Sequence, residues 1–429
     1  MIEQRESIPA SGIGQLARAN LCLLEGALRE QWHLGQQIAL CWCQVPEGID
    51  VLMVPHYYLA NFTASLNDCS PTDRLDALNG KFIRQLIGGE RQMSIEDFRG
   101  TARRLELPPC RIELPIPLRG EAVAAAEALV RRFSISYVPK RAVLLFDIVD
   151  FSLYTPFEQT SQLNSLSYSL NAACSKLLRK NIAVDFARTT TGDGFYVWHR
   201  STSPTSHVEL FQFMLLTLAD NAIARRKARG NTAPLLRTGF HIGSHYEFNQ
   251  VEGLNPTLSS YIVGDVTIEL ARMLDKARPG QIFLGEFAAT MPTSSSDAAY
   301  LVDVDSPRFV ERLGKHLEGL RGLEIAGERV IAMHCYLSGE SGSSAGSLAR
   351  RYRITDKHGR SRDAYNLRIN IHTREGRPLI LGVQEGLGPE PVTDRRSPHT
   401  GSQARAASSA AKPLWSPLSA RRARRVGGE

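Results

Sequence analysis

Helix patterns and strand patterns alternate through the middle of the chain, and this alternation restricts the fold more than any other feature of the sequence. Apolar residues recur at helical spacing in four segments: 120–133, 163–180, 208–228 and 266–277. Short apolar runs typical of strands lie between them: 143–149, 182–190, 194–200 and 235–243. This order predicts an α/β fold of the α+β sandwich type, with helices packed on a mixed, mainly antiparallel sheet.

The flanking regions differ from this middle part in composition. Residues 1–137 predict an N-terminal α/β region whose role the sequence does not indicate. Residues 339–348 contain the small, polar run ESGSSAGS, which is typical of a linker. Residues 349–390 carry two glycine-containing turns between alternating strands, so we expect a small β-rich module there. Residues 391–429 are rich in Ser, Ala, Pro and Arg and predict a disordered basic tail.

The net charge of +7 belongs almost entirely to that tail. Residues 391–429 hold seven Arg and one Lys against two acids, a balance of +6, which leaves +1 for the rest of the chain. The RRARR run near the end could touch anionic surfaces, but a solvated tail is the simpler interpretation. A nearly neutral body does not favour nucleic acid as a partner.

Cysteine usage and the N-terminus both favour the cytoplasm. The seven cysteines are scattered without a Cys-x-x-Cys pair, which favours reduced thiols over disulfides or a zinc site. The first residues lack the order of a signal peptide, and no apolar run is long enough to cross a bilayer. We therefore expect a cytoplasmic protein without a membrane span.

Two segments carry aspartates beside apolar strands. VLLFDIVDFS (143–152) places Asp147 and Asp150 at the end of such a run, either as metal ligands or as ordinary loop and helix-cap residues. TTTGDGFYVWH (189–199) places Asp193 between two glycines, in what is at least a hairpin turn. If both strand ends meet, Asp147 and Asp193 supply the carboxylates that hold two divalent cations with triphosphate oxygens. Asp150 is then expected to cap the following helix.

Four segments in this order resemble the class III nucleotide cyclases, the adenylyl and guanylyl cyclase family. They are FDIVDFS, TGDGF, RTGFHIG and VGDVTIELARM, and the resemblance covers residues 138–338, which it identifies as the catalytic domain. It implies a homodimer with active sites shared between two chains. It also implies two divalent cations per site, Mn²⁺ or Mg²⁺.

The resemblance implies a role for each matching residue. Asp147, Asp193 and the main-chain carbonyl of Ile148 would be metal ligands, Phe146 would belong to the substrate site, and Arg272 would stabilise charge on the reacting phosphate. An alternative for Arg272 is a helix-surface residue paired with Asp275 or Glu269.

Three positions depart from the purine cyclase pattern. Thr189 and Tyr261 stand where that family reads adenine with Lys and Asp, and Ile268 replaces the asparagine that orients the ribose. Hydroxyl groups on Thr189 and Tyr261 can pair with a pyrimidine, and the larger tyrosine fills the volume of the missing ring. This pattern resembles the bacterial pyrimidine cyclases of anti-phage defence, which make cyclic UMP or cyclic CMP.

A further short stretch, AYNLRINI (364–371), resembles the sensor domain that follows cyclases in such defence systems; an ordinary β-hairpin module explains the same residues. We therefore expect a uridylate cyclase whose product activates an effector protein. The alternatives are a cyclase that makes cyclic CMP or cyclic AMP, and a catalytically silent nucleotide-sensing module.

Overall fold

The computed structural model describes residues 14–64, 74–252, 257–293, 300–325, 327–340, 348–356, 359–374 and 376–384. The basic tail and the middle of the expected linker lie outside these ranges. No helix in the described ranges is both long and apolar enough to span a membrane.

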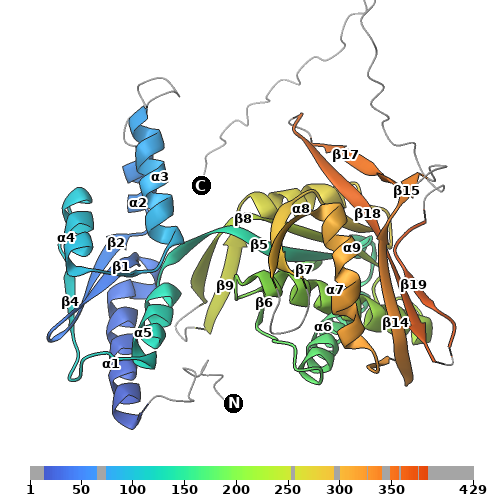
Figure 1. The fold of residues 1–429 in the computed structure, drawn as a ribbon, viewed down its shortest axis with the longest axis horizontal. Coiled ribbons are helices and arrows are strands. Elements are labelled where there is room, and N and C mark those ends of the chain that lie inside the picture. The colour runs from blue at the N-terminus through green and yellow to red at the C-terminus, as the bar shows by residue number, and fades with distance from the viewer. Residues whose placement is uncertain are drawn as a thin grey trace, which may run out of the picture. The chain divides into compact units, whose positions relative to one another are not determined.

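The N-terminal region is a four-stranded sheet with helices on both faces (Figure 1). Its strands, in the spatial order β3-β1-β2-β4, are β1 (Gln37–Val45), β2 (Gly48–Pro55), β3 (Gln92–Met93) and β4 (Cys110–Glu113). Its helices are α1 (Gln15–Trp32), α2 (Tyr58–Ala64), α3 (Arg74–Gly88), α4 (Ile95–Arg104) and α5 (Glu121–Arg132). Alternate residues of β1 enter two cores: Trp42 packs with α1 and α5, whereas Cys41 packs with α3 and α4.

A larger, eleven-stranded sheet follows, in the main order β13-β14-β18-β10-β8-β5-β7-β6, with β17 and β19 on β18 and β9 on β8. Its strands are β5 (Ile135–Ile148), β6 (Phe186–Thr190), β7 (Gly194–His199), β8 (Leu236–Glu252), β9 (Thr257–Val263), β10 (Ile282–Gly285), β13 (Glu324–Ile325), β14 (Glu328–Leu337), β17 (Arg351–Thr355), β18 (Ser361–Thr373) and β19 (Leu379–Leu381). Only β10 and β8 pair in parallel among these strands of the described ranges, so the predicted mixed, mainly antiparallel α/β fold is confirmed.

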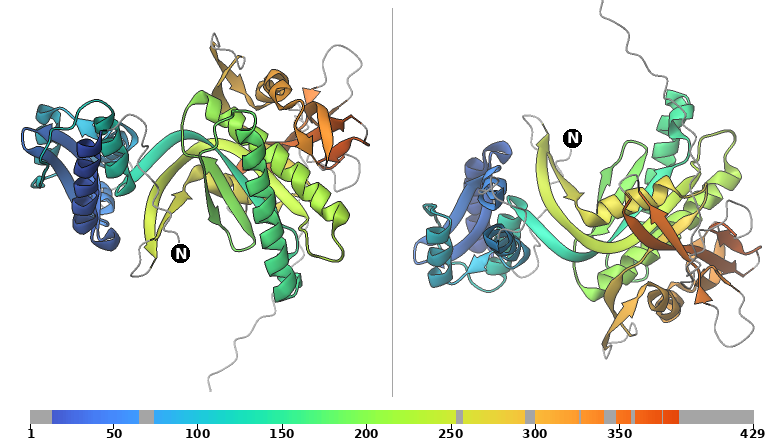
Figure 2. Two further views of the ribbon diagram at one scale, coloured as in Figure 1. Left: turned by 90° about the horizontal axis from the view of Figure 1, so that it is seen from below. Right: turned by 90° about the horizontal axis from the view of Figure 1, so that it is seen from above.

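The helices of this part are α6 (Pro156–Leu178), α7 (Pro204–Lys227), α8 (Asp265–Asp275) and α9 (Ser306–Leu317). Leu144 and Phe146 of β5 pack in the core that contains α6 and α7, whereas Val143 and Leu145 pack with α8. Alternate side chains of β5 therefore pack in two different cores. The views in Figure 2 show helices on both faces of the sheet. Two small sheets complete the fold: β11 (Ala288–Pro292) with β12 (Leu301–Asp305), and β15 (Gly339–Glu340) with β16 (Leu348–Ala349).

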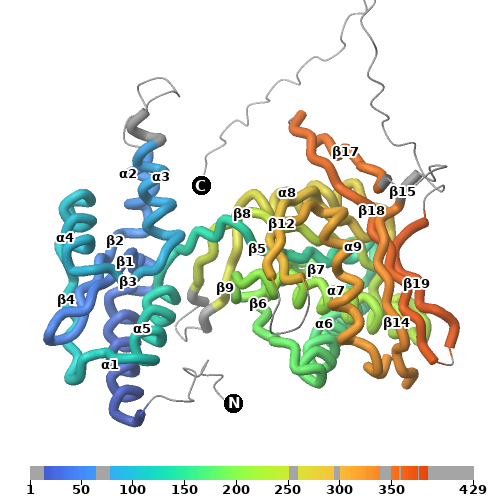
Figure 3. Tube along the Cα trace, in the orientation of Figure 1, coloured from blue at the N-terminus to red at the C-terminus, as the bar shows by residue number. Residues whose placement is uncertain are grey.

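The C-terminal strands differ from the expectation of a separate module. β18 hydrogen-bonds to β10 on one side and to β14 on the other, so β17, β18 and β19 continue the large sheet (Figure 3). Ile369 and Ile371 of β18 are fully buried in the same core as Phe146. The alternating pattern predicted these strands, but strand partners distant in sequence are not visible in a local pattern.

Asp150 also differs from its expected role as a helix cap. It adopts a left-handed conformation (φ 55°) and starts a short 3₁₀ turn without a side-chain capping bond. The cap of α6 is Thr155, whose hydroxyl accepts from the Glu158 amide while the Glu158 carboxylate accepts from the Thr155 amide.

Candidate active site

Two of the predicted acidic residues lie at adjoining strand ends. Asp147, near the end of β5, is opposite Gly194 of β7 on one side and Arg237 of β8 on the other. The turn that carries Asp193 closes against this end, because the Ile148 amide donates to the Asp193 carbonyl at 3.0 Å. The sheet therefore brings Asp147, Ile148 and Asp193 together.

The glycines beside Asp193 explain why the turn fits so closely. Gly192 has φ of 99°, a conformation that side chains with a Cβ rarely adopt. A Cβ on Gly194 would lie 1.9 Å from the carbonyl oxygen of Phe146. Both glycines thus allow the turn to approach β5, which is a requirement for holding one ion between Asp147 and Asp193.

Arg237 is a neighbour of Asp147 that the sequence analysis did not single out. Its Nε donates to Asp147 Oδ2 at 2.7 Å, and the two side chains form an ion pair. The signal was its place in the RTGFHIG strand, but only the β5–β8 register puts Arg237 opposite Asp147. This pairing places a guanidinium directly at the candidate metal site.

The surroundings of Asp147 disfavour the charged form of its carboxyl group. Burial raises its pKa, and Arg237 only partly offsets this effect, while repulsion from Asp193 and Asp275 raises the pKa further. Asp193 is half-buried, and its Oδ1 accepts from the Thr191 hydroxyl at 3.1 Å. A multivalent cation would relieve the repulsion between the two acids, and carboxylate and carbonyl oxygens are the ligands that Mg²⁺ and Mn²⁺ prefer.

The donor set therefore fits divalent cations, provided that the substrate supplies further oxygens. No group of three or more His, Cys, Asp or Glu side chains within the described ranges could hold an ion unaided. The side chain of Ile148 is a buried hydrocarbon without donor atoms, so only its main-chain carbonyl could be a ligand.

Arg272 lies on α8 and pairs with Asp275, as the alternative interpretation of this residue expected. Its Nη1 is 3.4 Å from Asp275 Oδ2, whereas Glu269 pairs with His241 at 2.5 Å and with Arg362 at 3.0 Å. Arg272 Nε is buried without a partner in the described part of the chain. Within one chain, Asp275 of α8 is among the groups that raise the pKa of Asp147.

The residues expected to read the base lie on two strands that contact each other. Thr189 of β6 is opposite Tyr196 of β7, whose hydroxyl donates to the Thr267 carbonyl at 3.0 Å. Tyr261 of β9 stacks on Phe248 with ring centroids 5.9 Å apart. Ile268 is 48% exposed on α8.

Phe146 does not line an open site. Its side chain is fully buried in the core beneath α6 and α7, so only its main chain, against Gly194, is near the acidic residues.

Among the solved structures that match part of this chain at low identity are three nucleotide cyclases. No protein-family profile matches this chain, and no curated protein matches its sequence. The guanylyl cyclase Cya2 matches at 11% identity and a TM-score of 0.33, covering 59% of this chain and 96% of that one. The adenylyl cyclase CyaB from P. aeruginosa matches at 16% and 0.28, covering 41% and 98%. The guanylate cyclase domain of RhGC from Catenaria anguillulae, in complex with GTP, matches at 14% and 0.28, covering 40% and 98%.

Proposed function

We propose that this chain is a nucleotide cyclase that converts UTP to 3′,5′-cyclic UMP and pyrophosphate. The observation that carries the proposal is the meeting of Asp147 and Asp193 at adjoining strand ends, with their mutual repulsion and with Arg237 beside them. Such a site suits a substrate that arrives with divalent cations and a negatively charged triphosphate.

In the reaction, the ribose 3′-oxygen forms a bond to the α-phosphorus and the bond to the bridging oxygen of the β-phosphate breaks. The 3′-hydroxyl proton is released and pyrophosphate leaves with the bond electrons. Asp147, Asp193 and the Ile148 carbonyl would hold two cations, Mn²⁺ or Mg²⁺, whose chemistry is to acidify the hydroxyl and to neutralise the phosphates.

The chain's own cations have complementary tasks. Arg237 lies where it can bind a phosphate oxygen once a metal ion has taken over the charge of Asp147. Arg272 has a buried Nε without a partner in the described ranges, and its guanidinium would bind the equatorial oxygens of the α-phosphate. In line with the resemblance to the class III cyclases, we propose that Arg272 serves the site of a second copy in a homodimer. In its own chain it contacts Asp275.

Base selection would depend on Thr189 and Tyr261. Their hydroxyls donate and accept hydrogen bonds, which matches the edge of uracil and does not supply the charged pair expected for adenine. We further propose that the cyclic pyrimidine nucleotide activates an effector protein in anti-phage defence, with residues 349–390 as the sensing segment.

The direct test is to incubate the full chain with each of four labelled nucleoside triphosphates and Mn²⁺, with Asp193→Ala as the blank. We expect UTP to be cyclised fastest, ATP and GTP poorly, and the blank to be inactive. Replacing Thr189 with Lys and Tyr261 with Asp should reduce UTP turnover by about tenfold or more. Preference for ATP would contradict the pyrimidine assignment, and no product from any nucleotide would favour a silent module.

A further inference from the structure

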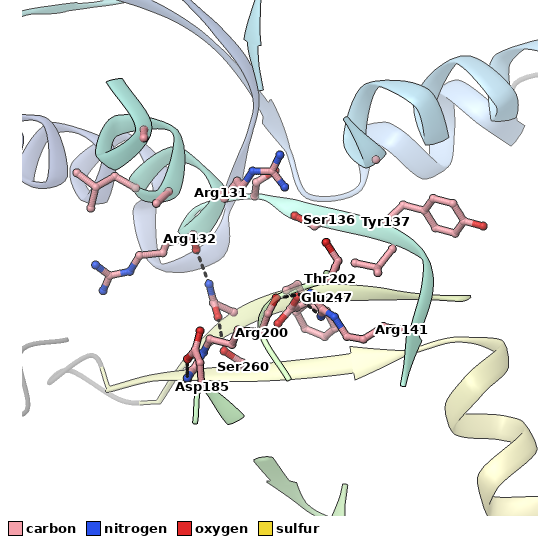
Figure 4. Close-up of a pocket in the computed structure, with 18 of the residues that line it drawn as sticks. Arg131, Arg132, Ser136, Tyr137, Arg141, Asp185, Arg200, Thr202, Glu247 and Ser260 are labelled. Carbon is pink, nitrogen blue, oxygen red and sulfur yellow. Dashed lines mark hydrogen bonds and ion pairs between the residues drawn. The ribbon is translucent and has the colours of Figure 1, made fainter. Parts of the chain in front are cut away.

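A cavity of about 1440 Å³ lies where the N-terminal region meets the large sheet. One wall is α5, and the other is formed by the first residues of β5 and by β8 and β9 (Figure 4). One hydrogen bond joins these walls directly, because Asn249 Nδ2 donates to the Arg132 carbonyl at 2.8 Å. Outside the cavity, Arg91 of the N-terminal region donates from Nη2 to the Ile135 carbonyl of β5 at 2.9 Å. We call this space the junction cavity.

The junction cavity is separate from the candidate active site. Arg141, which lines it, precedes Asp147 by six residues on the same strand, which corresponds to roughly 20 Å at the rise of a β-strand. Asp185 and Arg200, which also line it, lie at the end of the β6–β7 hairpin opposite the turn that carries Asp193.

Small side chains on α5 leave the space open. Ala124, Ala125 and Ala128 line it together with Leu129, so the middle of this wall is apolar, whereas its two ends carry charged residues. The volume of the junction cavity exceeds the roughly 300–1,000 Å³ of ordinary small-molecule sites, which is enough space for a ligand the size of a nucleotide.

The polar lining of the cavity is predominantly cationic. The basic lining residues are Arg131, Arg132, Lys140, Arg141 and Arg200. The acidic ones are Glu121, Asp185 and Glu247. Basic lining residues therefore outnumber acidic lining residues. Each lining arginine pairs with an acid, and in the order given above these acids are Glu127, Glu25, Glu247 and Asp185. Lys140 is exposed and makes no ion pair with any residue that the structure describes, so its charge is available to a ligand.

Two of these arginines also retain unused donors. The Nε atoms of Arg132 and Arg141 are buried without a hydrogen-bond partner in the described ranges. Arg141 is only 4% exposed, and its two other nitrogens are occupied by Glu247 and by the Arg200 carbonyl. An unused buried donor is costly, but neither Nε atom is accessible from the cavity, so a ligand reaches them only if these side chains turn.

We propose that the junction cavity binds a planar organic anion of the nucleotide class. The cationic lining would take the phosphate, and the apolar α5 wall with Phe248 would take the ring. Phe248 also stacks on Tyr261, the residue proposed to read the substrate base. A ligand in the cavity therefore adjusts Tyr261 and acts as a regulator; this coupling, though not the binding, rests on the proposed function.

The binding test uses the full chain, without divalent cations and with EDTA, and the fluorescent probe trinitrophenyl-AMP. We expect saturable binding that AMP reverses at concentrations about tenfold lower than either inorganic phosphate or adenosine, because only AMP has both parts. Absence of probe binding, or equal competition by phosphate or adenosine alone, would overturn the proposal.

Substitutions at exposed positions locate the site without disturbing the core. Ala128→Trp should fill the cavity and weaken probe binding about tenfold or more, and Lys140→Glu should weaken it about threefold to tenfold. The matched controls are Ala60→Trp on α2 and Lys81→Glu on α3, both at exposed positions outside the cavity, which should bind like the wild type. Wild-type affinity in Ala128→Trp would refute this location.

A second measurement separates this inference from the proposed function. With Mn²⁺ restored, saturating AMP should change the KM for UTP about threefold or more in the wild type and not in Ala128→Trp. Probe binding without any cyclase activity would refute the proposed function and leave the site. Cyclase activity without probe binding would support the proposed function and refute the binding site in the junction cavity.

Discussion

Strands β5 and β8 carry two arginine–carboxylate pairs of opposite orientation: one joins directly opposite residues near the end of the paired region, and the other starts from Arg141 in its middle. In the first pair the acid is on β5 and the arginine on β8, as Asp147 and Arg237. In the second pair the arginine is on β5 and the acid on β8, as Arg141 and Glu247. The same antiparallel ladder therefore presents the same chemistry twice, in two different environments.

The difference lies in how fully each carboxylate is satisfied. Burial opposes the ionisation of Glu247, but Arg141, at 2.6 Å, and the Trp198 Nε1–H, at 3.0 Å, outweigh it and lower its pKa. For Asp147, burial and the neighbouring acids outweigh Arg237 and raise the pKa. Glu247 thus forms a structural ion pair with Arg141. The charge of the Asp147 carboxylate, in contrast, would be stabilised by an additional cation.

Loss of Asp147 should have the largest effect, and on catalysis rather than on folding. Asp147→Ala should reduce cyclase activity about a thousandfold or more, because a metal ligand is lost, while the circular dichroism spectrum and the thermal midpoint stay close to those of the wild type. Retention of activity would remove the two-metal site from this description.

Co-expressing Asp147→Ala with Arg272→Ala chains extends this test to the dimer. Each mutant homodimer should be inactive, but every mixed dimer has one intact site if Arg272 acts on the partner chain. Random pairing then gives about a quarter of the wild-type activity. Confirmed heterodimers without activity would place Arg272 and Asp147 in the same site of one chain.

Loss of Glu247 should instead act on folding. Glu247→Gln leaves Arg141 buried without its counter-charge and should lower the free energy of unfolding by about 3 kcal/mol. Urea denaturation at pH 7 measures this difference. Arg29→Met, which breaks the exposed pair with Glu25 on α1, is the control and should change stability little.

The stability difference should depend on pH in a defined direction. Because the folded pKa of Glu247 lies below its ordinary value of 4.5, its stabilising contribution is complete above that value and is lost as the pH falls through the folded pKa. The wild type and Glu247→Gln should therefore converge in stability as the pH falls below 4.5. A constant difference down to pH 3 would mean that the pair is not the cause.

The smallest effect is expected at Asp150, three residues beyond Asp147. Because Asp150 has a left-handed backbone conformation, the Asp150→Ala variant should be about 1 kcal/mol less stable than the wild type, whereas Asp150→Gly should not lose stability. Cyclase activity should stay within about twofold in both, since neither removes a metal ligand. Activity lost as completely as in Asp147→Ala would mean that both acids hold the metal.

Local patterns predicted much of the fold. The periods of 2 and 3.6 residues correctly located β5, the β6–β7 hairpin, α5 and the helices α6 to α8. They missed the joining of β18 to the large sheet, because strand pairing between residues 285 and 364 depends on contacts distant in sequence. They also missed Thr155 as the cap of α6, although a threonine followed three residues later by a glutamate is the usual signal.

The sequence by itself determined the residue types of the candidate site: two acids at strand ends, one of them between glycines, the arginine of α8, and the uncharged pair Thr189 and Tyr261. Only the tertiary structure decided which charges meet. The register of β5 with β8 put Arg237 opposite Asp147, and the side chain of Arg141 reaches along the ladder to Glu247. The packing of α5 left a cavity beside Phe248. Side-chain chemistry is encoded residue by residue, whereas pKa values, ion pairs and cavities depend on distances between segments that only folding brings together.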